Sequence, residues 1–323
     1  MVSRCWAFTN LLSIIGLALG VSQLAGPRLF ASSPAKAQEV TQAPATAAPA
    51  NAPSETLYFV ALDKQGKPIT DLKPEEVRAF EDNVEQKIIS VLPAVNEPLT
   101  IGLFFDISGS RRADRSINEE VRLTREFVHT IWHEGDAGFV LAFSNEVFVV
   151  TQPTHMLKEV DDGLSKIPDA TYWGPTALYD ALCILKPDRL NGIPGRKIYV
   201  ALGDFDDNSS RNKLGNVVEL AHEAKIAILP VILREGFGAG GYGKKVEKRG
   251  LESAQKIADK TGADVLIPES PKQLSATFER IANELRASYR IVYVPSSPAG
   301  DRRKKKLHIE TTRPQVTLLF PKN

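Results

Sequence analysis

The sequence predicts an α/β fold in which a doubly wound, mostly parallel sheet is inserted into a small β-rich module formed by both chain ends. The first observation behind this prediction is that apolar strand patterns alternate with amphipathic helix patterns over residues 98–288, which is typical of a parallel sheet covered on both faces. The second is that the flanking segments, 55–97 and 289–323, carry strand and turn patterns but are each too short to form a core alone. With 323 residues, 43% of them hydrophobic, the chain is long enough for one full domain and a smaller one.

Residues 1–37 have the features of an export signal. Arg4 supplies a positive charge before a mostly apolar stretch over 11–24, and Ala35-Lys36-Ala37 fits a small-x-small cleavage site. The pattern predicts a secreted protein, or a periplasmic or cell-envelope one. An uncleaved N-terminal anchor is the alternative, and only in that case do we expect membrane contact. Residues 38–54 are rich in Ala, Pro, Thr and Gln and are expected to be a disordered linker.

The β-rich module is expected from the two flanking segments together. In the first segment, turn residues interrupt the strand patterns at 63–68 and 81–86, and in the second, two strands stand on either side of a polar turn. The predicted strands cover residues 56–62, 77–80, 87–91, 289–294, 306–311 and 316–320.

The central segment, 98–288, carries five apolar strand patterns and six helix patterns. The strands are predicted at Leu99–Ile107, Ala137–Ser144, Ile198–Leu202, Ile226–Leu233 and Ala263–Ile267. A short edge strand, Glu146–Thr151, should pair antiparallel with the second of these because only Asn145 separates them. The helices are predicted at Ser116–His133, His155–Ile167, Ala177–Leu185, Lys213–Lys225, Glu247–Thr261 and Pro271–Ala287.

Oxygen-bearing side chains gather where two of these strands end. The first strand ends in an Asp-x-Ser-x-Ser cluster, a loop supplies a threonine, and the apolar run Ile198–Gly203 closes on a second aspartate. Because ligands of open α/β sheets lie at the carboxyl ends of the strands, we expect these side chains to meet. Oxygen-only sites suit hard dications, so the sequence predicts a metal site for Mg²⁺, with Mn²⁺ or Ca²⁺ as alternatives. The candidate ligands are Asp106, Ser108, Ser110, Thr176 and Asp204.

In these residues the sequence resembles the von Willebrand factor type A (VWFA) domain, specifically its secreted bacterial VWFA-related branch. In that family the Asp-x-Ser-x-Ser, Thr and Asp elements form the metal-ion-dependent adhesion site, which is the role that the resemblance implies for the five candidates. The order of elements over 98–288 is also similar to the family, and Gly66–Val77 loosely matches a segment that precedes the domain there. Two positions depart from the family pattern: Phe205 replaces a frequent glycine, and Gly174-Pro175 replaces a commoner Gly-Gly.

A simpler interpretation of the Asp-x-Ser-x-Ser cluster is a turn or a helix N-cap, because Asp and Ser side chains accept backbone N–H bonds in both. That interpretation would suffice if the cluster stood alone. The metal site is favoured because the order, the separations and the strand-end placement of all three elements agree.

The function is predicted from the small number of charged ligands in the candidate site. Two carboxylates and three hydroxyls leave part of an octahedral shell to water, which an Asp or Glu of a protein partner could displace. We therefore expect an exported, non-enzymatic binding protein. One alternative is a metal-dependent hydrolase using the same cluster, which needs a base near the metal-bound water. Another is a structural envelope module whose site is vestigial.

Nucleic acid and nucleotides are not expected as partners. Loss of residues 1–37 lowers Lys plus Arg from 40 to 37 against 39 Asp plus Glu, so the mature chain lacks a basic excess. Gly236–Gly241 has dinucleotide-motif spacing, but it follows a late strand instead of opening the first βα unit. Gly238–Lys244 has phosphate-loop spacing, but Lys245 stands where that motif needs Ser or Thr.

Other conspicuous residues have structural interpretations. His129 and His133 share a helix face, but Thr130 follows His129 where a zinc protease needs a glutamate, so the pair is expected at a helix C-terminus. Cys183 lies in an apolar helix pattern and is expected to be a buried, inert thiol. The basic run Arg302–Lys306 is interpreted as a solvated turn. For Tyr172-Trp173, a ligand-facing rim and packing under the loop are equal alternatives.

Overall fold

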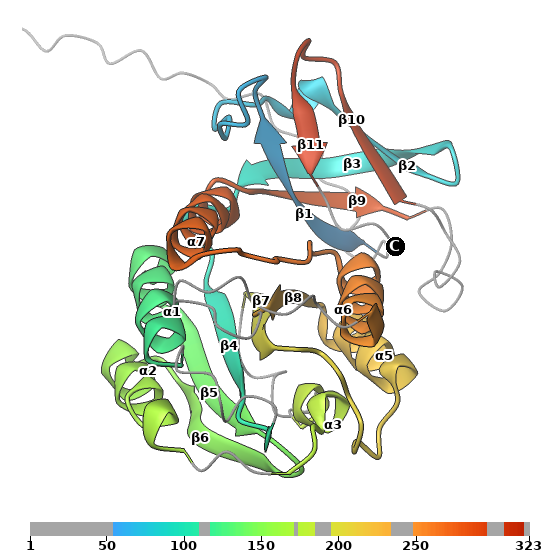
Figure 1. Ribbon diagram of the computed structural model, residues 1–323. Coiled ribbons are helices and arrows are strands. Elements are labelled where there is room, and N and C mark those ends of the chain that lie inside the picture. The colour runs from blue at the N-terminus through green and yellow to red at the C-terminus, as the bar shows by residue number, and fades with distance from the viewer. Residues whose placement is uncertain are drawn as a thin grey trace, which may run out of the picture. The chain divides into compact units, whose positions relative to one another are not determined.

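The computed structural model of the protein describes residues 54–109, 117–170, 174–184, 195–233, 248–295 and 307–319. The described strands form two sheets, one of five strands that is mostly parallel and one of six strands that is antiparallel (Figure 1). The mixed α/β class predicted from the sequence is confirmed.

The five-stranded sheet has the order β6-β5-β4-β7-β8. Its central strand, β4, pairs in parallel with β5 and β7, and β7 pairs in parallel with β8. The edge strand β6 is antiparallel to β5, as the sequence predicts. Every residue of β4 and β5 is buried, which explains why both read as continuous apolar runs. The strands are β4 (Leu99–Asp106), β5 (Ala137–Phe143), β6 (Val147–Thr154), β7 (Arg196–Gly203) and β8 (Ile226–Ile232).

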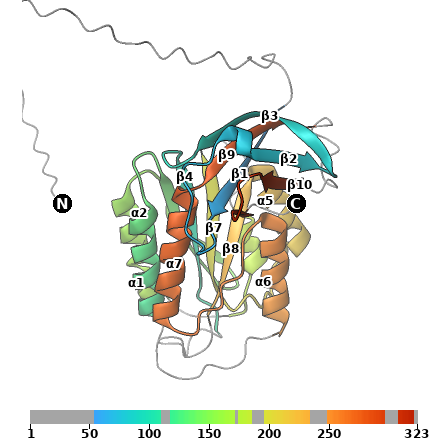
Figure 2. The same ribbon diagram turned by 90° about the horizontal axis from the view of Figure 1, so that it is seen from above.

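Helices cover both faces of this sheet, and each face has its own core. Val121, Phe127 and Phe278 lie in the core beneath α1, α2 and α7, whereas Leu178, Val217 and Ile257 lie in the core beneath α3, α5 and α6. Figure 2 shows α1, α2 and α7 on one side of the strands and α5 and α6 on the other. The helices are α1 (Ile117–Ile131), α2 (Leu157–Leu164), α3 (Leu178–Leu182), α5 (Leu214–Ala224), α6 (Lys248–Thr261) and α7 (Pro271–Arg286), with 3-10 helices at Pro74–Glu76 and Ile167–Asp169.

Two predictions for this half of the chain need correction. Ala263–Ile267 is not a strand, because among its residues only Leu266 forms a bridge, in parallel with Val231. The helix predicted at Ala177–Leu185 is α3 alone, which ends at Leu182. The apolar residues of these segments pack against the cores, most of them only partly buried, and such packing does not determine how many residues form the regular element.

The six-stranded sheet has the order β10-β2-β3-β9-β1-β11, so strands from residues 55–97 and from 289–323 pair with one another. Its core contains Phe59, Val91 and Tyr289, and the rings of Phe59 and Tyr289 are stacked with centroids 5.3 Å apart. The strands are β1 (Glu55–Leu62), β2 (Val77–Glu81), β3 (Val84–Pro93), β9 (Tyr289–Val294), β10 (Leu307–Thr311) and β11 (Thr317–Leu319).

The turns of this sheet differ from the predicted ones. β9 and β10 do not pair across a turn, because β10 pairs with β2 and β9 lies between β3 and β1. The turn predicted at 81–86 contains only Asp82 and Asn83, whose φ angles of 47° and 68° suit a tight two-residue hairpin. Asn and Asp tolerate this left-handed backbone better than most residues, so β3 begins three residues earlier than the 87–91 pattern indicated.

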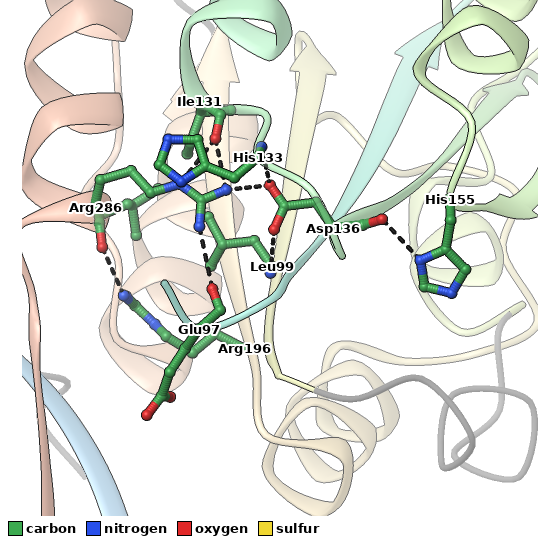
Figure 3. A network of polar contacts seen from close by, with 9 residues as sticks. Glu97, Leu99, Ile131, His133, Asp136, His155, Arg196 and Arg286 are labelled. Carbon is green, nitrogen blue, oxygen red and sulfur yellow. Dashed lines mark hydrogen bonds and ion pairs between the residues drawn. The ribbon is translucent and has the colours of Figure 1, made fainter. Parts of the chain in front are cut away.

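A buried polar network holds the amino-terminal end of β4 (Figure 3). The carboxylate of Asp136 accepts the backbone N–H of Leu99 at 2.8 Å and of His133 at 2.7 Å, and it forms an ion pair with Arg286. The guanidinium of Arg286 also donates to the carbonyls of Ile131 and Glu97. The end of α7 is therefore tied to the start of β4, at the opposite end of that strand from Asp106.

In the described part of the chain, no helix combines the length and the apolar character needed to cross a membrane.

Candidate metal centre

Asp106 is the last residue of β4 and is only 3% exposed. Its Oδ1 accepts the backbone N–H of Ser108 at 2.8 Å, which folds the chain into a tight turn directly after the strand. Ser108 is 1% exposed, so this turn presents a carboxylate and a hydroxyl from an almost fully buried position. We call residues 106–109 the β4 turn.

The β4 turn contacts the loop that carries the candidate threonine. The backbone N–H of Gly109 donates to the carbonyl of Gly174 at 2.9 Å, two residues before Thr176. Gly174 has a φ of 76°, which glycine adopts without strain. Thr176 itself is 3% exposed, and the N–H of Ala177 donates to the carbonyl of Ser144 at 2.7 Å, just after β5. Residues 174–180, named here the threonine segment, are thus held at the carboxyl ends of β4 and β5.

Asp204 directly follows β7, which pairs in parallel with β4. The preceding Gly203 lies so close to Asp106 that a Cβ on the glycine would be 2.7 Å from the Cβ of Asp106. Asp204 is half-buried, and its Oδ1 accepts the N–H of Asp206 at 3.0 Å. We call residues 204–212 the β7 turn.

The β7 turn is shaped by a residue that departs from the family pattern. Phe205 has a φ of 61°, a left-handed conformation that costs a non-glycine residue roughly 1–2 kcal/mol. Its ring is 2% exposed and belongs to the core beneath α3, α5 and α6, so burial of the side chain offsets this cost. The positive φ gives a physical reason why a glycine suits this position, and why a buried phenylalanine can replace it.

Helix α6 fixes the other side of the β7 turn. A Cβ on Gly250 would be 2.1 Å from the carbonyl oxygen of Asp204, so the first turn of the helix lies against that backbone. The adjacent Arg249 places Nε 3.1 Å from Oδ1 of Asp206 and donates to the carbonyl of Asp207 at 2.5 Å. The contact with Asp206 is an ion pair without the alignment of a good hydrogen bond. The acidic residue after Asp204 therefore has a positive partner.

Further polar residues join the β7 turn to the threonine segment. Asp207 accepts the N–H of Tyr179 at 3.0 Å, and Asp180 accepts the N–H groups of Arg211 and Asn212 at 3.0 and 2.8 Å. Burial raises the pKa of Asp180, but these N–H bonds outweigh it and leave the pKa lower than usual. Asp180, Asp206 and Asp207 lie close in the sequence to the candidate ligands, and in the structure their carboxylates hold the loops.

Three ligand-bearing segments therefore touch one another in pairs. The β4 turn contacts the threonine segment through Gly109 and Gly174, and the threonine segment contacts the β7 turn through Thr176 and Asn208. Gly203, the last residue of β7 and directly before the β7 turn, lies against Asp106 and closes the ring. Of the five candidates, the structure places Asp106, Ser108, Thr176 and Asp204 on this ring, whereas Ser110 lies outside the described residues.

The donor chemistry of the ring fits a hard dication. Carboxylate and hydroxyl oxygens are ligands that Mg²⁺ accepts. Gly203 lies so close to Asp106 that any side chain at position 203 would collide with that carboxylate. Among the described residues there is no group of three or more His, Cys, Asp or Glu side chains placed to hold a metal. The candidate site contains only two carboxylates, and its other candidate ligands are hydroxyls.

The histidines make contacts away from this ring. His129 lies 2.8 Å from a carboxylate oxygen of Asp161, the N–H of His133 donates to Asp136, and a ring nitrogen of His155 lies 2.8 Å from the carbonyl of Asp136. His222 contacts the carbonyl of Lys260, and His308 contacts Glu310.

The remaining conspicuous residues divide into one that is described and several that are not. Burial raises the pKa of the Cys183 thiol to about 11, and Asp180 acts in the same direction, so this thiol is a poor nucleophile. Tyr172-Trp173, Gly236–Gly241, Gly238–Lys244 with Lys245, and Arg302–Lys306 lie outside the described residues.

No family model and no curated protein sequence matches this chain. Among solved structures, the chain is similar to an aerotolerance-related membrane protein from Bacteroides fragilis, with 15% identity over 58% of this chain and 98% of that one and a TM-score of 0.44. It is also similar to proximal thread matrix protein 1 from the mussel byssus, in the form with a zinc-occupied MIDAS motif (15% identity, 62% of this chain and 48% of that one, TM-score 0.45). A third structure is a von Willebrand factor type A protein from Catenulispora acidiphila (13% identity, 85% and 74% coverage, TM-score 0.44). The solved structures similar to this chain thus include a protein of the von Willebrand factor type A family, the family that the sequence resembles.

Proposed function

We propose that the protein is an exported, non-enzymatic binding protein that uses a divalent cation at the ring of three segments to bind an acidic side chain of a protein partner. The observation that carries the proposal is the ring itself, because it brings Asp106, Ser108 and the segments of Thr176 and Asp204 to one end of the parallel sheet. Mg²⁺ is the proposed cation, with Mn²⁺ or Ca²⁺ as alternatives.

The proposed mechanism follows from the charge of the site. Asp106, Ser108, Thr176 and Asp204 would hold the cation, together with Ser110, and a bound cation would supply a Lewis-acidic position for a carboxylate. The two negative charges of Asp106 and Asp204 would only balance the two positive charges of the cation, so a third carboxylate from a partner would not be strongly repelled. Arg249 pairs with Asp206 and keeps that neighbouring carboxylate engaged outside the ligand set. The burial of Asp106 and Ser108 makes their interactions with a cation less screened by solvent.

We propose the same organisation that the sequence predicts for the rest of the chain. Residues 1–37 would direct export, residues 38–54 would act as a linker, and the domain 98–288 would be inserted into the module of 55–97 and 289–323. The pairing of β1 with β9 and of β2 with β10 supports a module built from both flanking segments. A cleaved signal would leave a secreted, periplasmic or cell-envelope protein.

The first test is calorimetric titration of Mg²⁺ and Mn²⁺ into the metal-free protein and into the Asp106→Ala variant. Asp161→Ala is the matched control, because Asp161 is an acidic residue of α2 that pairs with His129 on α1, away from the ring. We expect one binding site that is lost in Asp106→Ala and retained in Asp161→Ala. Absence of binding in the folded wild-type protein, or equal binding by both variants, would contradict the proposed metal site.

The second test addresses the partner. An immobilised library of Asp- and Glu-containing peptides is screened with the protein in Mg²⁺ and in chelator, and each hit is remade with Asn or Gln at the acidic position. We expect binding that needs the cation, the peptide carboxylate and Asp106. Cleavage of any peptide during this screen would favour the hydrolase instead, whereas binding that ignores the cation would favour a structural module.

A further inference from the structure

The strongest connection in the ring lies between the threonine segment and the β7 turn. Asn208 forms hydrogen bonds with both backbone groups of Thr176. Its side-chain Oδ1 accepts the N–H of Thr176 at 2.8 Å, and its backbone N–H donates to the Thr176 carbonyl at 3.0 Å. The N–H of Ser209 donates to the same carbonyl at 3.1 Å. A residue four positions after Asp204 thus determines where the backbone of another candidate ligand lies.

The two segments make further contacts on the far side of Thr176. The N–H of Tyr179 donates to Asp207, and the N–H of Asp180 donates to Ser210 at 3.0 Å. These bonds orient the start of α3, but they reach residues that follow Thr176 by three and four positions. Within the described residues, Asn208 is the side chain that contacts the backbone of Thr176 directly.

The exposure of Asn208 shows that it holds Thr176 without packing in the core. Asn208 is exposed, whereas Thr176 is 3% exposed, so the buried ligand is held by a residue that fills no core space. The side chain of Asn208 therefore acts through its hydrogen bond and not through packing against the core. A defined bond from its side chain to the backbone of a candidate ligand therefore points to placement of that ligand.

We propose that Asn208 is a positioning residue of the metal centre, which holds Thr176 at a fixed place relative to Asp204 before the cation binds. This inference rests on the proposed metal site and names a residue that the metal-binding motif does not include. The Asn208 side chain does not bind the metal. Its bond lowers the conformational entropy that the threonine segment would otherwise lose on binding.

The test compares Asn208→Ala and Asn208→Asp with a matched control. Asn208→Ala removes the acceptor for the Thr176 N–H, whereas Asn208→Asp keeps an oxygen at that position. Asn216→Ala is the control, because Asn216 is also exposed and its Oδ1 also accepts a backbone N–H, that of Lys213 at 2.9 Å, but at the start of α5. Affinity for Mn²⁺ is measured by calorimetry and by electron paramagnetic resonance, and folding by urea unfolding.

We expect Asn208→Ala to weaken Mn²⁺ binding by about 5- to 10-fold, which lies within the range that the loss of one hydrogen bond gives. Asn208→Asp should bind within about 3-fold of wild type or more tightly, and Asn216→Ala should bind as wild type does. In the metal-free protein, exchange of the Thr176 amide proton should be faster in Asn208→Ala than in wild type or Asn208→Asp, because Asn208→Ala removes the acceptor of that proton. A role in stability alone would lower the free energy of unfolding without weakening Mn²⁺ binding by the folded protein.

The outcomes distinguish this proposal from the metal site on which it rests. If wild type binds Mn²⁺ and Asp106→Ala does not, but Asn208→Ala binds as wild type does, the positioning role is overturned and the metal site stands. An equal loss of affinity in Asn208→Ala and Asn208→Asp also overturns it, because the retained acceptor would then have no effect. If the folded wild-type protein binds no Mn²⁺, both proposals fail together.

Discussion

Gly203 lies directly against Asp106: a Cβ at position 203 would be 2.7 Å from the Cβ of Asp106 and 2.9 Å from its Oδ2. The two residues end neighbouring parallel strands, β7 and β4, and both strands are buried there. Glycine at this position is therefore needed for space, because its neighbour is a carboxylate that has to remain in place for the proposed site.

The first prediction concerns Gly203→Ala. The added methyl group has to displace Asp106, so we expect a loss of about 1–3 kcal/mol in the free energy of unfolding, the usual cost of overpacking. We also expect Mn²⁺ affinity to fall at least 10-fold. Urea unfolding and calorimetry measure the two effects. Gly215→Ala in α5 is the control, since a Cβ there would meet nothing within 4 Å. Its Mn²⁺ affinity should stay close to wild type, and its free energy of unfolding should be unchanged or slightly higher, because alanine favours a helix over glycine. Unchanged Mn²⁺ affinity in a folded Gly203→Ala protein would argue against Asp106 as a ligand.

The second prediction concerns the left-handed backbone of Phe205. Removal of this buried ring should destabilise the protein by about 3–5 kcal/mol. Glycine usually lowers stability relative to alanine, but at a φ of 61° it relieves strain, so Phe205→Gly should be at least as stable as Phe205→Ala. At Phe143, a buried residue of β5, glycine should be about 1 kcal/mol worse than alanine. Urea unfolding of the glycine and alanine variants at both positions tests this prediction. If glycine were less stable than alanine at position 205 as well as at position 143, strain at Phe205 would be contradicted.

The third prediction concerns the buried ion pair of Asp136 and Arg286 shown in Figure 3. Arg286→Met leaves a buried carboxylate without its cation and should lower the free energy of unfolding by about 3–5 kcal/mol. Arg280→Met is the control on the same helix, where the exposed pair with Glu284 should contribute only about 0.3–0.5 kcal/mol. Because this pair lies at the opposite end of β4 from Asp106, Mn²⁺ affinity should not change in either variant. A similar small loss in both would show that the network of Figure 3 contributes little.

The fourth prediction concerns acid sensitivity. Hydrogen bonds from Arg313, together with the backbone N–H of Lys73, lower the pKa of Glu76 to about 2 from the ordinary value of 4.5. A carboxylate with a lowered pKa in the folded state stabilises the protein above its unfolded-state pKa, and this contribution is lost as pH falls from 4.5 towards 2. Glu76→Gln should therefore flatten the decline of the melting temperature over this interval. Glu75→Gln, at the adjacent exposed residue, is the control, and equal acid profiles for Glu76→Gln and wild type would refute the assignment.

Local patterns predicted the parallel sheet closely because its strands are buried on both faces. β4, β5, β7 and β8 each lie within two residues of their predicted bounds, since turn residues interrupt the apolar runs at both ends. Long-range pairing was not predictable in the same way. Nothing in the sequence of β10 indicates that its neighbour is β2, because that choice depends on the packing of the whole sheet.

The candidate site shows the same division. Asp106 and Asp204 could be expected to come together because parallel strands end at a common edge. The role of Asn208 could not be expected, because an exposed asparagine in a polar turn has no periodic signal and its partner Thr176 is 32 residues away. The positive φ of Phe205 was not predicted: the sequence showed only that Phe205 departs from the family pattern, and the left-handed backbone became visible in the structure.

The antiparallel sheet has a consequence for the order in which the protein folds. Its strand β1 is synthesised before the parallel sheet, yet its neighbours β9 and β11 are synthesised after it, with Val60 paired to Leu319. Pairing across so long a stretch of chain is entropically costly until the intervening residues have folded and brought the two ends together. We therefore expect the parallel sheet to form first and to act as the template on which β1 meets its partners. Until that moment β1 exposes strand edges open to pairing with other chains, so a chaperone that shields the newly made N-terminal strands would protect the protein from aggregation.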